Sequence, residues 1–339
     1  MDGQSVRCAN AECNFAVDGR CVEGFAIDEC PHVSTLEVDD IEEVEEAEPL
    51  REEEKVVSLA SGETLIRGDA SSLQRRRPSR SVGIVAPNEA GKTSLIASVY
   101  DLLQNGPVDG IGFAGSSTLI GFERVCHDAR TSSKRGLPHT ERTSAGADAT
   151  FFHLDLRPAD GEVVSLFIAD RSGEDYLAAS DDLTRATGFF ELRRADVLTV
   201  LVNGEHLATS AQRHETKAVT PQIVGALVEA GAVRRGCRLA VVLTKQDVVL
   251  ASPNEARVAA DFSEIVQAII EDNGSSFATI EHFVVAASPR ELGKVTRGEG
   301  VNRLLRLWLS PTPAAPSEVP RPSESTRLMD LLDTAGETE

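Results

Sequence analysis

A short apolar run, Val82-Gly83-Ile84-Val85, leads directly into Ala86-Pro87-Asn88-Glu89-Ala90-Gly91-Lys92-Thr93-Ser94. Apolar residues at helical spacing follow and predict a helix over residues 92–104. A strand, a glycine-bearing loop and a helix in this order are typical of a phosphate-binding loop of the Walker A kind. In such a loop, backbone N–H groups converge on a polyphosphate at the positive end of the helix dipole. We therefore predict that residues 86–94 bind the phosphates of a nucleotide.

The residue types within this loop have separate physical roles. Gly91 permits a close backbone approach that a Cβ would block, Lys92 supplies a positive charge to the outer phosphates, and Thr93 can ligate Mg²⁺. Ala86 stands where the first glycine of the motif is usual, so the φ angle there must stay negative or accept strain. A chance Gly-Lys-Thr at a helix start is the alternative, and the flanking strand and helix disfavour it.

From residue 81 onward, short apolar runs alternate with longer helical patterns. This alternation is typical of βαβ units and predicts an α/β fold with a doubly wound, mostly parallel sheet. Strands are expected over residues 81–85, 149–157, 163–169, 197–202, 239–243 and 282–286. Helices are expected over residues 92–104, 212–229, 254–271 and 301–309.

Two polar segments follow strands at the positions a nucleotide site needs. Asp170, in Asp170-Arg171-Ser172-Gly173-Glu174, can hold the Mg²⁺ shell, and Gly173 can offer its N–H to a γ-phosphate. Asp247, in Thr244-Lys245-Gln246-Asp247, can accept hydrogen bonds from N1–H and the 2-amino group of guanine, a donor pair that adenine lacks. Ligands of open α/β sheets bind at the carboxyl ends of the strands, so this order of segments predicts a GTPase.

The remaining base contacts are predicted at the ends of the strands expected over residues 239–243 and 282–286. The aliphatic stem of Lys245 would lie along the base and ribose. Ala287 and Ser288 follow the strand expected over residues 282–286 and could contact the guanine oxygen through backbone N–H groups.

The residues expected to act in hydrolysis are Lys92, Thr143, Gly173 and Glu174. Thr140 and Thr143 are both candidates for the threonine that completes the Mg²⁺ shell, and we favour Thr143. Glu174 stands where many GTPases use a glutamine to orient water. Its carboxylate repels a γ-phosphate and donates no hydrogen bond unless protonated, so we expect hydrolysis that is slow or needs a partner. The long segment Asn105–Gly146 is expected to carry structure or a binding role of its own.

These motifs, together with Ser61-Gly62-Glu63-Thr64-Leu65, the run from Phe113 to Glu123 and the run from Pro138 to Ser144, resemble the bacterial double-GTPase group of translation-factor-class P-loop GTPases. The resemblance covers roughly residues 56–309. It implies a Ras-like core, Mg²⁺-dependent binding of GTP and GDP, and a regulatory switch in multi-gene bacterial systems thought to respond to phage or other stress. It extends to an N-terminal cysteine cluster that ends in Cys30-Pro31-His32, which such proteins can carry.

That cluster comprises Cys8, Cys13, Cys21 and Cys30. The spacing departs from the paired Cys-x2-Cys of common zinc ribbons, but four thiolates can form a tetrahedral Zn²⁺ site in a reducing compartment. We predict a zinc-ribbon-like module, with His32 as a substitute ligand. Uncommitted thiols and a redox or iron–sulfur site remain alternatives.

The 339-residue chain carries a net charge of −20, and residues 1–55 alone hold 17 Asp or Glu against 4 Lys or Arg. This sign argues against phosphate-reading nucleic-acid binding. No apolar run reaches 18 residues, and the first thirty residues do not resemble a secretory signal, so we expect a cytoplasmic protein with no membrane span. The expected domains are a cysteine-rich module (1–35), an acidic linker (36–55), a GTPase domain (56–309) and a Pro-rich tail (310–339).

The sequence therefore predicts a Mg²⁺-dependent switch that hydrolyses GTP to GDP and phosphate. Protein partners are expected at the switch segments, the N-terminal module or the C-terminal tail. One alternative is a scaffold that holds a nucleotide with little turnover, and another is an ATP-dependent P-loop enzyme. A zinc-dependent nucleic-acid adaptor is disfavoured by the acidic N-terminal segment.

Overall fold

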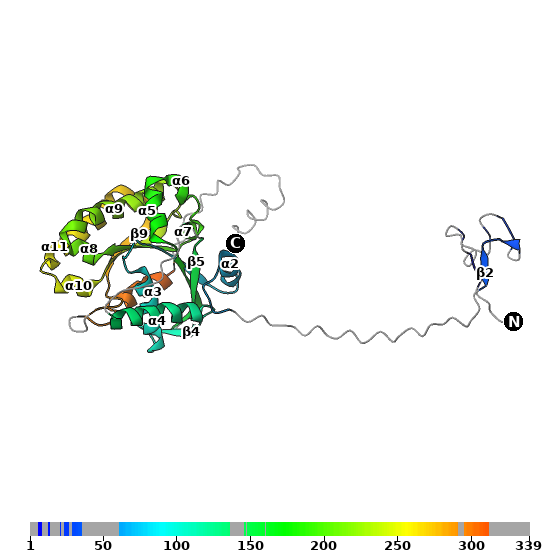
Figure 1. Cartoon of the computed structure of the whole chain (residues 1–339), viewed down its shortest axis with the longest axis horizontal. Coiled ribbons are helices and arrows are strands. Elements are labelled where there is room, and N and C mark those ends of the chain that lie inside the picture. Colours follow the sequence, from blue (N-terminus) through cyan, green and yellow to red (C-terminus); the bar gives the residue numbers. More distant parts are fainter. Residues whose placement is uncertain are drawn as a thin grey trace, which may run out of the picture. The chain divides into compact units, whose positions relative to one another are not determined.

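The computed structural model describes residues 6–8, 13, 21, 24–26, 29–35, 61–135, 146, 148–159, 161–290 and 295–311. The chain divides into two compact units, Met1–Leu59 and Ala60–Glu339 (Figure 1). In the first unit, the described strands β1 (Val6–Cys8) and β2 (Val33–Thr35) pair antiparallel. The second unit holds the sheet and helices described below.

Within the described residues of the second unit, seven strands form one sheet in the order β4-β5-β6-β3-β7-β8-β9. The strands are β3 (Ser79–Val85), β4 (Ile111–Gly115), β5 (Thr150–Pro158), β6 (Val164–Asp170), β7 (Val197–Asn203), β8 (Cys237–Thr244) and β9 (Phe277–Val284). The pairs from β6 through β3, β7 and β8 to β9 are parallel. Only β5 runs against its neighbours. The prediction of an α/β fold with a mostly parallel sheet is therefore confirmed.

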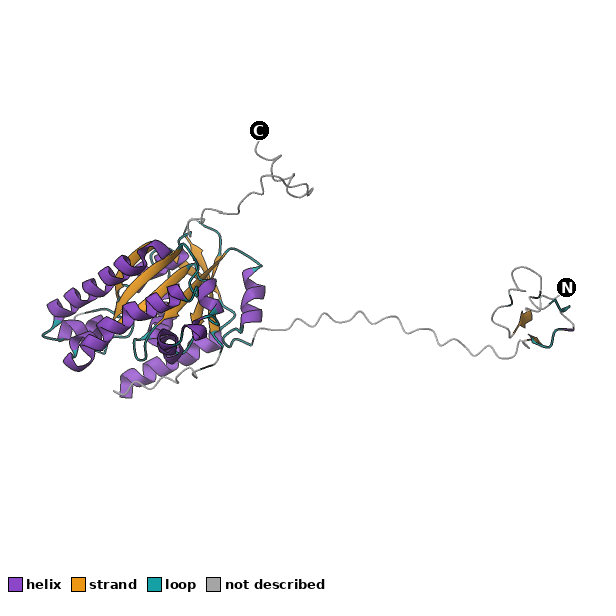
Figure 2. Ribbon diagram, turned by 90° about the horizontal axis from the view of Figure 1, so that it is seen from above, coloured by secondary structure: helices purple, strands orange, loops and turns teal. Residues whose placement is uncertain are grey.

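Helices cover both faces of this sheet (Figure 2). They are α2 (Arg67–Gln74), α3 (Lys92–Gln104), α4 (Leu119–Arg135), α5 (Gly173–Asp181), α6 (Leu183–Ala186), α7 (Phe190–Arg193), α8 (Gly204–Ala208), α9 (Ser210–Glu229), α10 (Gln246–Ala251), α11 (Glu255–Asn273) and α12 (Val301–Leu309), with a 3-10 turn η2 (Gly274–Ser276). Among the described helices, none has the length and apolar character needed to cross a membrane.

The strands contribute alternate residues to two separate apolar layers. On β8, Ala240 and Val242 pack with α3, α4 and α12, whereas Leu239, Val241 and Leu243 pack with α5, α9 and α11. Every residue of β7 and β8 is buried. Burial on both faces is what parallel strands require, because helices of the crossover connections lie on either side. This packing fixes the carboxyl ends of β3, β6, β7 and β8 along one edge of the sheet.

The structure follows the sequence prediction most closely at two helices, α3 and α12. The observed bounds of α3 and α12 match those expected. The segment Asn105–Gly146 carries β4 and α4, as expected of a segment with structure of its own. Within it, the Phe122 ring stacks on Tyr100 at a centroid distance of 4.8 Å.

The last strand begins earlier than the sequence indicated. We expected it over residues 282–286, and β9 instead runs over Phe277–Val284. It lies at the end of the sheet, with Thr279, Glu281 and His282 exposed. An edge strand of this kind shows no continuous apolar run, so its first half carries little sequence signal.

Candidate nucleotide-binding site

The predicted phosphate loop joins β3 to α3. Gly91 caps α3 in the left-handed region, with φ 88° and ψ 21°. Glu89 has φ 62°, which a non-glycine residue rarely adopts. The described non-glycine residues with positive φ are Glu89, Asp109 and Lys245. Ala86 is not one of them, so an alanine fits this position, where a glycine is usual, without a left-handed backbone. The residues from Pro87 to Glu89 lie toward solvent, whereas Ala86 and Ala90 are buried and anchor both ends of the loop.

Lys92 points from the first turn of α3 toward the end of β6. Its Nζ lies 2.7 Å from Oδ1 of Asp170 and also donates to the carbonyl of Arg171. Thr93 and Ser94 follow in the same turn, and both are half-buried. The structure thus brings together the predicted phosphate lysine, the predicted Mg²⁺-shell aspartate and the helical turn that carries the Thr93 hydroxyl.

Gly173 lies directly against the phosphate loop. A Cβ added there would meet the carbonyl oxygen of Ala86 at 2.5 Å and Oδ1 of Asn88 at 3.0 Å. The neighbouring Glu174 accepts a hydrogen bond from Nδ2 of Asn88 at 3.3 Å. Ser172 caps α5 by accepting the N–H of Glu174 at 3.3 Å. The Asp-x-x-Gly segment therefore adjoins the phosphate loop, and its glycine is a steric necessity.

A buried ion pair anchors this segment, and sequence reasoning missed it. Arg171 Nε donates to Glu191 Oε1 at 2.6 Å, and its Nη2 donates to Oε2 at 3.3 Å. The guanidinium also lies over the Phe189 ring, 4.6 Å from its centroid. Burial alone would lower the pKa of Arg171, but the hydrogen bond and charge of Glu191 raise it. Twenty residues separate the partners, and although Arg171 lies within the Asp-x-x-Gly segment, Glu191 stands in no recognisable motif.

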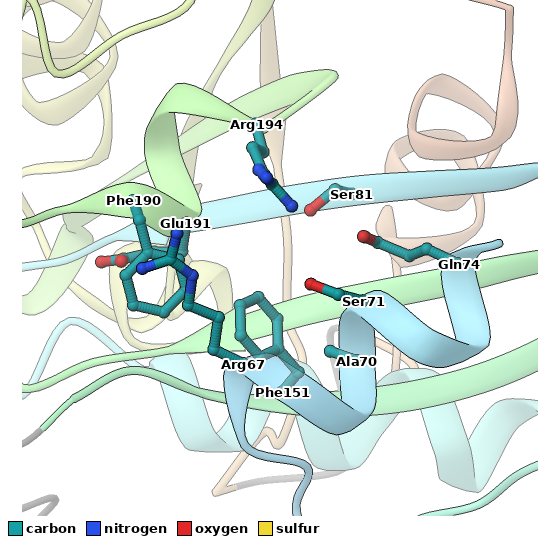
Figure 3. A pocket seen from close by; sticks show the side chains of 9 residues that line it. All are labelled: Arg67, Ala70, Ser71, Gln74, Ser81, Phe151, Phe190, Glu191 and Arg194. Carbon is teal, nitrogen blue, oxygen red and sulfur yellow. The ribbon is translucent and has the colours of Figure 1, made fainter.

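A small pocket lies beside Glu191, between α2, β5 and α7 (Figure 3). Arg67 stacks on the Phe190 ring at 4.5 Å on one side of it, and Arg194 and Ser81 lie on the other. Its cavity volume of about 10 Å³ has room for a single water.

The predicted base-reading segment is tied to the phosphate loop. Oγ1 of Thr244 lies 2.9 Å from the carbonyl of Ala90 and 3.2 Å from that of Val202, and its one proton serves either. Asn203, at the end of β7, donates from Nδ2 to the carbonyl of Glu89 at 3.1 Å. These contacts place the ends of β7 and β8 beside the loop. The sequence pattern did not single out Asn203, although its position after an apolar strand was a usable signal.

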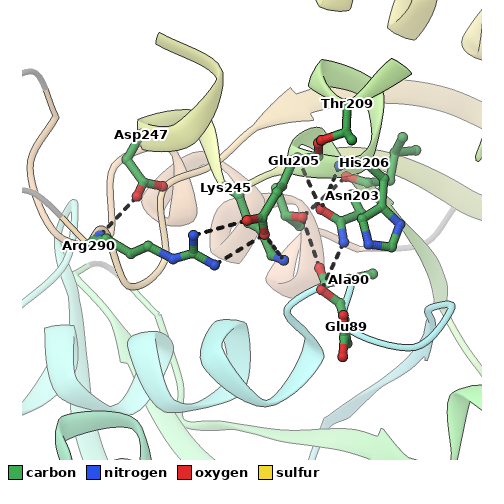
Figure 4. A network of polar contacts seen from close by, with 11 residues as sticks. Glu89, Ala90, Asn203, Glu205, His206, Thr209, Lys245, Asp247 and Arg290 are labelled. Atoms are coloured by element: carbon green, nitrogen blue, oxygen red, sulfur yellow. Dashed lines mark hydrogen bonds and ion pairs between the residues drawn. The ribbon is translucent and has the colours of Figure 1, made fainter. Parts of the chain in front are cut away.

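Polar side chains from three segments meet beyond Thr244 (Figure 4). Lys245 is in the left-handed region, with φ 55°, and its Nζ pairs with Oε2 of Glu205 at 2.7 Å. Arg290 also pairs with Glu205, and its backbone N–H donates to Oδ2 of Asp247 at 2.9 Å. Burial alone would raise the pKa of Glu205, but the hydrogen bonds and charges of Lys245 and Arg290 lower it overall.

Ala287 and Ser288 follow β9 on the same side. Ala287 is buried and Ser288 is half-buried. The N–H of Gln246 donates to the carbonyl of Val285 at 3.2 Å, so this segment lies beside the base-reading segment. The predicted base contacts thus come from adjacent strand ends.

Several predicted residues lie outside the described part of the chain. These include Thr140 and Thr143 and most of the Pro-rich tail, residues 312–339. Cys13, Cys21 and Cys30 are described and half-buried, while the side chain of Cys8 is not described. No group of three or more His, Cys, Asp or Glu suited to a metal occurs among the described residues, so zinc binding stays a prediction.

A mostly parallel sheet, with a phosphate loop after β3 and a Thr-Lys-x-Asp segment after β8, defines a P-loop nucleotide-binding protein of the GTPase class. The family described as Double-GTPase 2 matches residues 80–309, which is more than half of the chain. The chain therefore belongs to the double-GTPase 2 family, and the resemblance inferred from the motifs is confirmed at the family level.

Solved structures give distant similarities. The chain is 16% identical to a chain of the signal recognition particle receptor SRb-GTP/SRX complex from Chaetomium thermophilum, covering 68% of this chain and 96% of that one, with a TM-score of 0.39. It is 12% identical to the Ski7 GTPase-like domain of S. cerevisiae bound to GDP and inorganic phosphate, covering 71% and 51%, with a TM-score of 0.38. No curated protein sequence matches the chain.

Proposed function

We propose that this protein binds Mg²⁺ and GTP at the carboxyl edge of its sheet and hydrolyses GTP to GDP and phosphate. The observation that carries the proposal is the hydrogen bond from Thr244 to the carbonyl of Ala90, at 2.9 Å. It fastens the base-reading segment to the phosphate loop. One nucleotide can then contact Lys92 with its phosphates and Asp247 with its base.

The phosphate end of the site has the right donors for a triphosphate and a hard cation. The backbone of residues 86–94 and the Lys92 ammonium would bind the phosphates. The Thr93 hydroxyl and the Asp170 carboxylate are oxygen donors of the kind that Mg²⁺ prefers, and Lys92 links their two elements. Mg²⁺ would supply charge neutralisation at the β- and γ-phosphates. Thr143 remains our proposed additional ligand.

The base end would select guanine. Asp247 would accept from N1–H and the 2-amino group, the stem of Lys245 would cover the base, and Ala287 and Ser288 would offer backbone N–H groups to the guanine oxygen. The hydrogen bond from the Arg290 backbone occupies one acceptor site of Asp247 Oδ2, and the remaining lone pairs of the two carboxylate oxygens can accept both guanine donors.

Hydrolysis should be slow in the isolated protein. Gly173 would offer its N–H to the γ-phosphate, and Glu174 lies beside the loop through its hydrogen bond with Asn88. A negatively charged Glu174 opposes the approach of a γ-phosphate and donates no hydrogen bond to it. We infer a regulatory switch whose turnover depends on protein partners, and we place it in the cytoplasm. Both inferences rest on the family and the composition.

The N-terminal unit would hold Zn²⁺ through Cys8, Cys13, Cys21 and Cys30. Support comes from the number and type of the thiols, since softer sulfur ligands suit Zn²⁺. Zinc content of the purified protein tests this: about one equivalent is expected, and its loss in a variant with all four cysteines changed to serine would confirm the ligands. A metal-free protein would contradict the assignment.

Nucleotide binding and single-turnover hydrolysis test the main proposal. The wild type should bind GTP in preference to ATP and convert it to GDP, and Lys92→Ala should abolish binding. Glu63→Gln, which alters an exposed ion pair with Arg124, is the control and should leave both unchanged. Tight GTP binding without GDP formation would favour the scaffold, and preference for ATP would favour the ATP-dependent enzyme.

A further inference from the structure

One carboxylate joins two cations at the base end of the site. Glu205 lies on α8, Lys245 follows β8 and Arg290 follows β9, so three separate segments meet at this side chain (Figure 4). Oε2 of Glu205 lies 2.7 Å from Lys245 Nζ. Nη1 and Nη2 of Arg290 lie 3.0 and 3.2 Å from Oε1 and Oε2. Both oxygens are therefore engaged, and the arginine fork is bidentate.

Arg290 extends this link to the base-reading carboxylate. Its guanidinium holds Glu205, while its own backbone N–H donates to Oδ2 of Asp247 at 2.9 Å. A single residue thus connects Glu205 to Asp247. Movement of the segment after β9 would disturb both contacts together.

The backbone conformation and the side-chain direction of Lys245 both need support from neighbouring residues. Its backbone has φ 55°, a conformation that costs a non-glycine residue free energy and persists only where the surroundings hold it. The ion pair with Glu205 extends the lysine stem in one direction. Without that carboxylate, the Lys245 ammonium and the Arg290 guanidinium would face each other as like charges, and both would move away.

The exposed fractions of the three side chains indicate that Glu205 does more than form a salt bridge on the surface. The Glu205 and Lys245 side chains are 28% and 22% exposed, so each is largely withdrawn from solvent. Arg290 is 59% exposed and closes the group on the outside. Solvent weakens exposed ion pairs, whereas a partly buried carboxylate with two bound cations holds their positions.

Given the proposed GTP binding, we propose that Glu205 is a positioning residue for guanine recognition, acting through Lys245 and Arg290. It holds the lysine stem where the base would lie and fixes the Arg290 backbone against Asp247. The nucleotide is then retained by its base as well as by its phosphates. Glu205 itself touches neither phosphate nor base.

The test compares GDP dissociation from the full-length wild type, Glu205→Gln, Arg290→Ala and the double variant. A fluorescent GDP analogue is displaced by excess GDP, and competition by inorganic triphosphate reports on the phosphate loop alone. Each single variant should release GDP about 5-fold faster or more, and the double variant no faster than the quicker single, because the residues act as one unit. Affinity for inorganic triphosphate should stay unchanged.

Glu63→Gln and Arg124→Ala form the matched control, because they break an exposed ion pair of 2.7 Å in the same unit. Both should release GDP at the wild-type rate. If Glu205→Gln fails to fold, Arg290→Ala decides, since its side chain lies outermost. A wild-type GDP dissociation rate in that variant, or an equal loss of triphosphate affinity, overturns the inference. Failure of the wild type to bind any guanine nucleotide would instead refute the proposed function.

Discussion

The absence of a side chain at Gly173 allows the Asp-x-x-Gly segment to lie against the phosphate loop. The position that a Cβ would occupy lies 2.5 Å from the Ala86 carbonyl oxygen. No real Cβ is that close to a backbone atom, so glycine is the only residue that keeps the Asp-x-x-Gly segment against the loop. The proposed γ-phosphate contact depends on the same approach.

Gly173→Ala should therefore displace this segment and slow single-turnover GTP hydrolysis by about 10- to 100-fold, because small misplacements of catalytic groups are costly. GDP affinity should change much less, since GDP lacks the γ-phosphate. Gly68→Ala is the control, because nothing lies within 4 Å of an added Cβ there. Wild-type hydrolysis in Gly173→Ala would contradict the assigned role.

At the level of secondary-structure elements, the Arg171–Glu191 ion pair joins the short helix α7 to the Asp-x-x-Gly segment. The side chains are 7% and 0% exposed. Removing one partner of a buried pair leaves an uncompensated charge, which usually costs far more than the pair contributes. The pair therefore fixes where the segment after β6 begins.

Glu191→Gln should lower the free energy of unfolding by about 3 kcal/mol, because the buried charge of Arg171 loses its bidentate partner and keeps only Asp175, at 3.5 Å. Urea unfolding measures this. Glu63→Gln breaks an exposed pair and should cost less than about 1 kcal/mol. If Glu191→Gln and Glu63→Gln lower the free energy of unfolding by the same small amount, the Arg171–Glu191 pair does not anchor the segment after β6.

Helices α9 and α11 are joined by a second ionic cluster. Asp261 accepts from Arg213 at 2.5 and 2.6 Å and from Lys217 at 2.9 Å, and its side chain is 2% exposed. The hydrogen bond from Arg213 is the main cause that lowers the pKa of Asp261 to about 2 from its usual 3.8, against the opposing effect of burial. A lowered pKa means that folding favours the charged carboxylate.

The contribution of Asp261 to the free energy of unfolding is fully present above the pKa that its carboxyl has in the unfolded chain. It is lost as the pH falls through the lower pKa of the folded protein. Between about pH 5 and pH 2, the stability advantage of the wild type over Asp261→Asn should shrink by about 2 kcal/mol. Denaturant unfolding at several pH values measures it. Asp272→Asn, an exposed change on the same helix, should show no such trend. A pH-independent difference would refute the assignment.

Patterns along the chain predicted elements with continuous apolar runs, such as β7 and β8, or with apolar residues at helical spacing, but missed contacts between elements. The bounds of α3 and α12 followed from apolar residues at helical spacing, and the loop between β3 and α3 lies where its spacing predicted. The contacts that Glu205, Arg290, Asn203 and Glu191 make depend on how segments far apart in sequence are brought together. Of these residues, only Asn203 carried a local signal, its position at the end of an apolar strand.

At the scale of the whole second unit, two apolar layers on either side of the sheet hold its carboxyl edge in place. Loop residues of the site are attached to that edge by hydrogen bonds from Thr244 and Asn203. The fold itself therefore holds in place the residues that we propose bind the nucleotide. This arrangement supports the central claim that one nucleotide spans from Lys92 to Asp247.

The most direct test of that claim is equilibrium binding of GTP, ATP and xanthosine triphosphate to the wild type and Asp247→Asn, with Asp69→Asn as an exposed control. Xanthine has a carbonyl where guanine has the 2-amino group, so an asparagine amide can donate to it. The wild type and the control should prefer GTP, and Asp247→Asn should prefer xanthosine triphosphate. If Asp247→Asn keeps the wild-type order of affinities, Asp247 does not contact the base and the account is wrong.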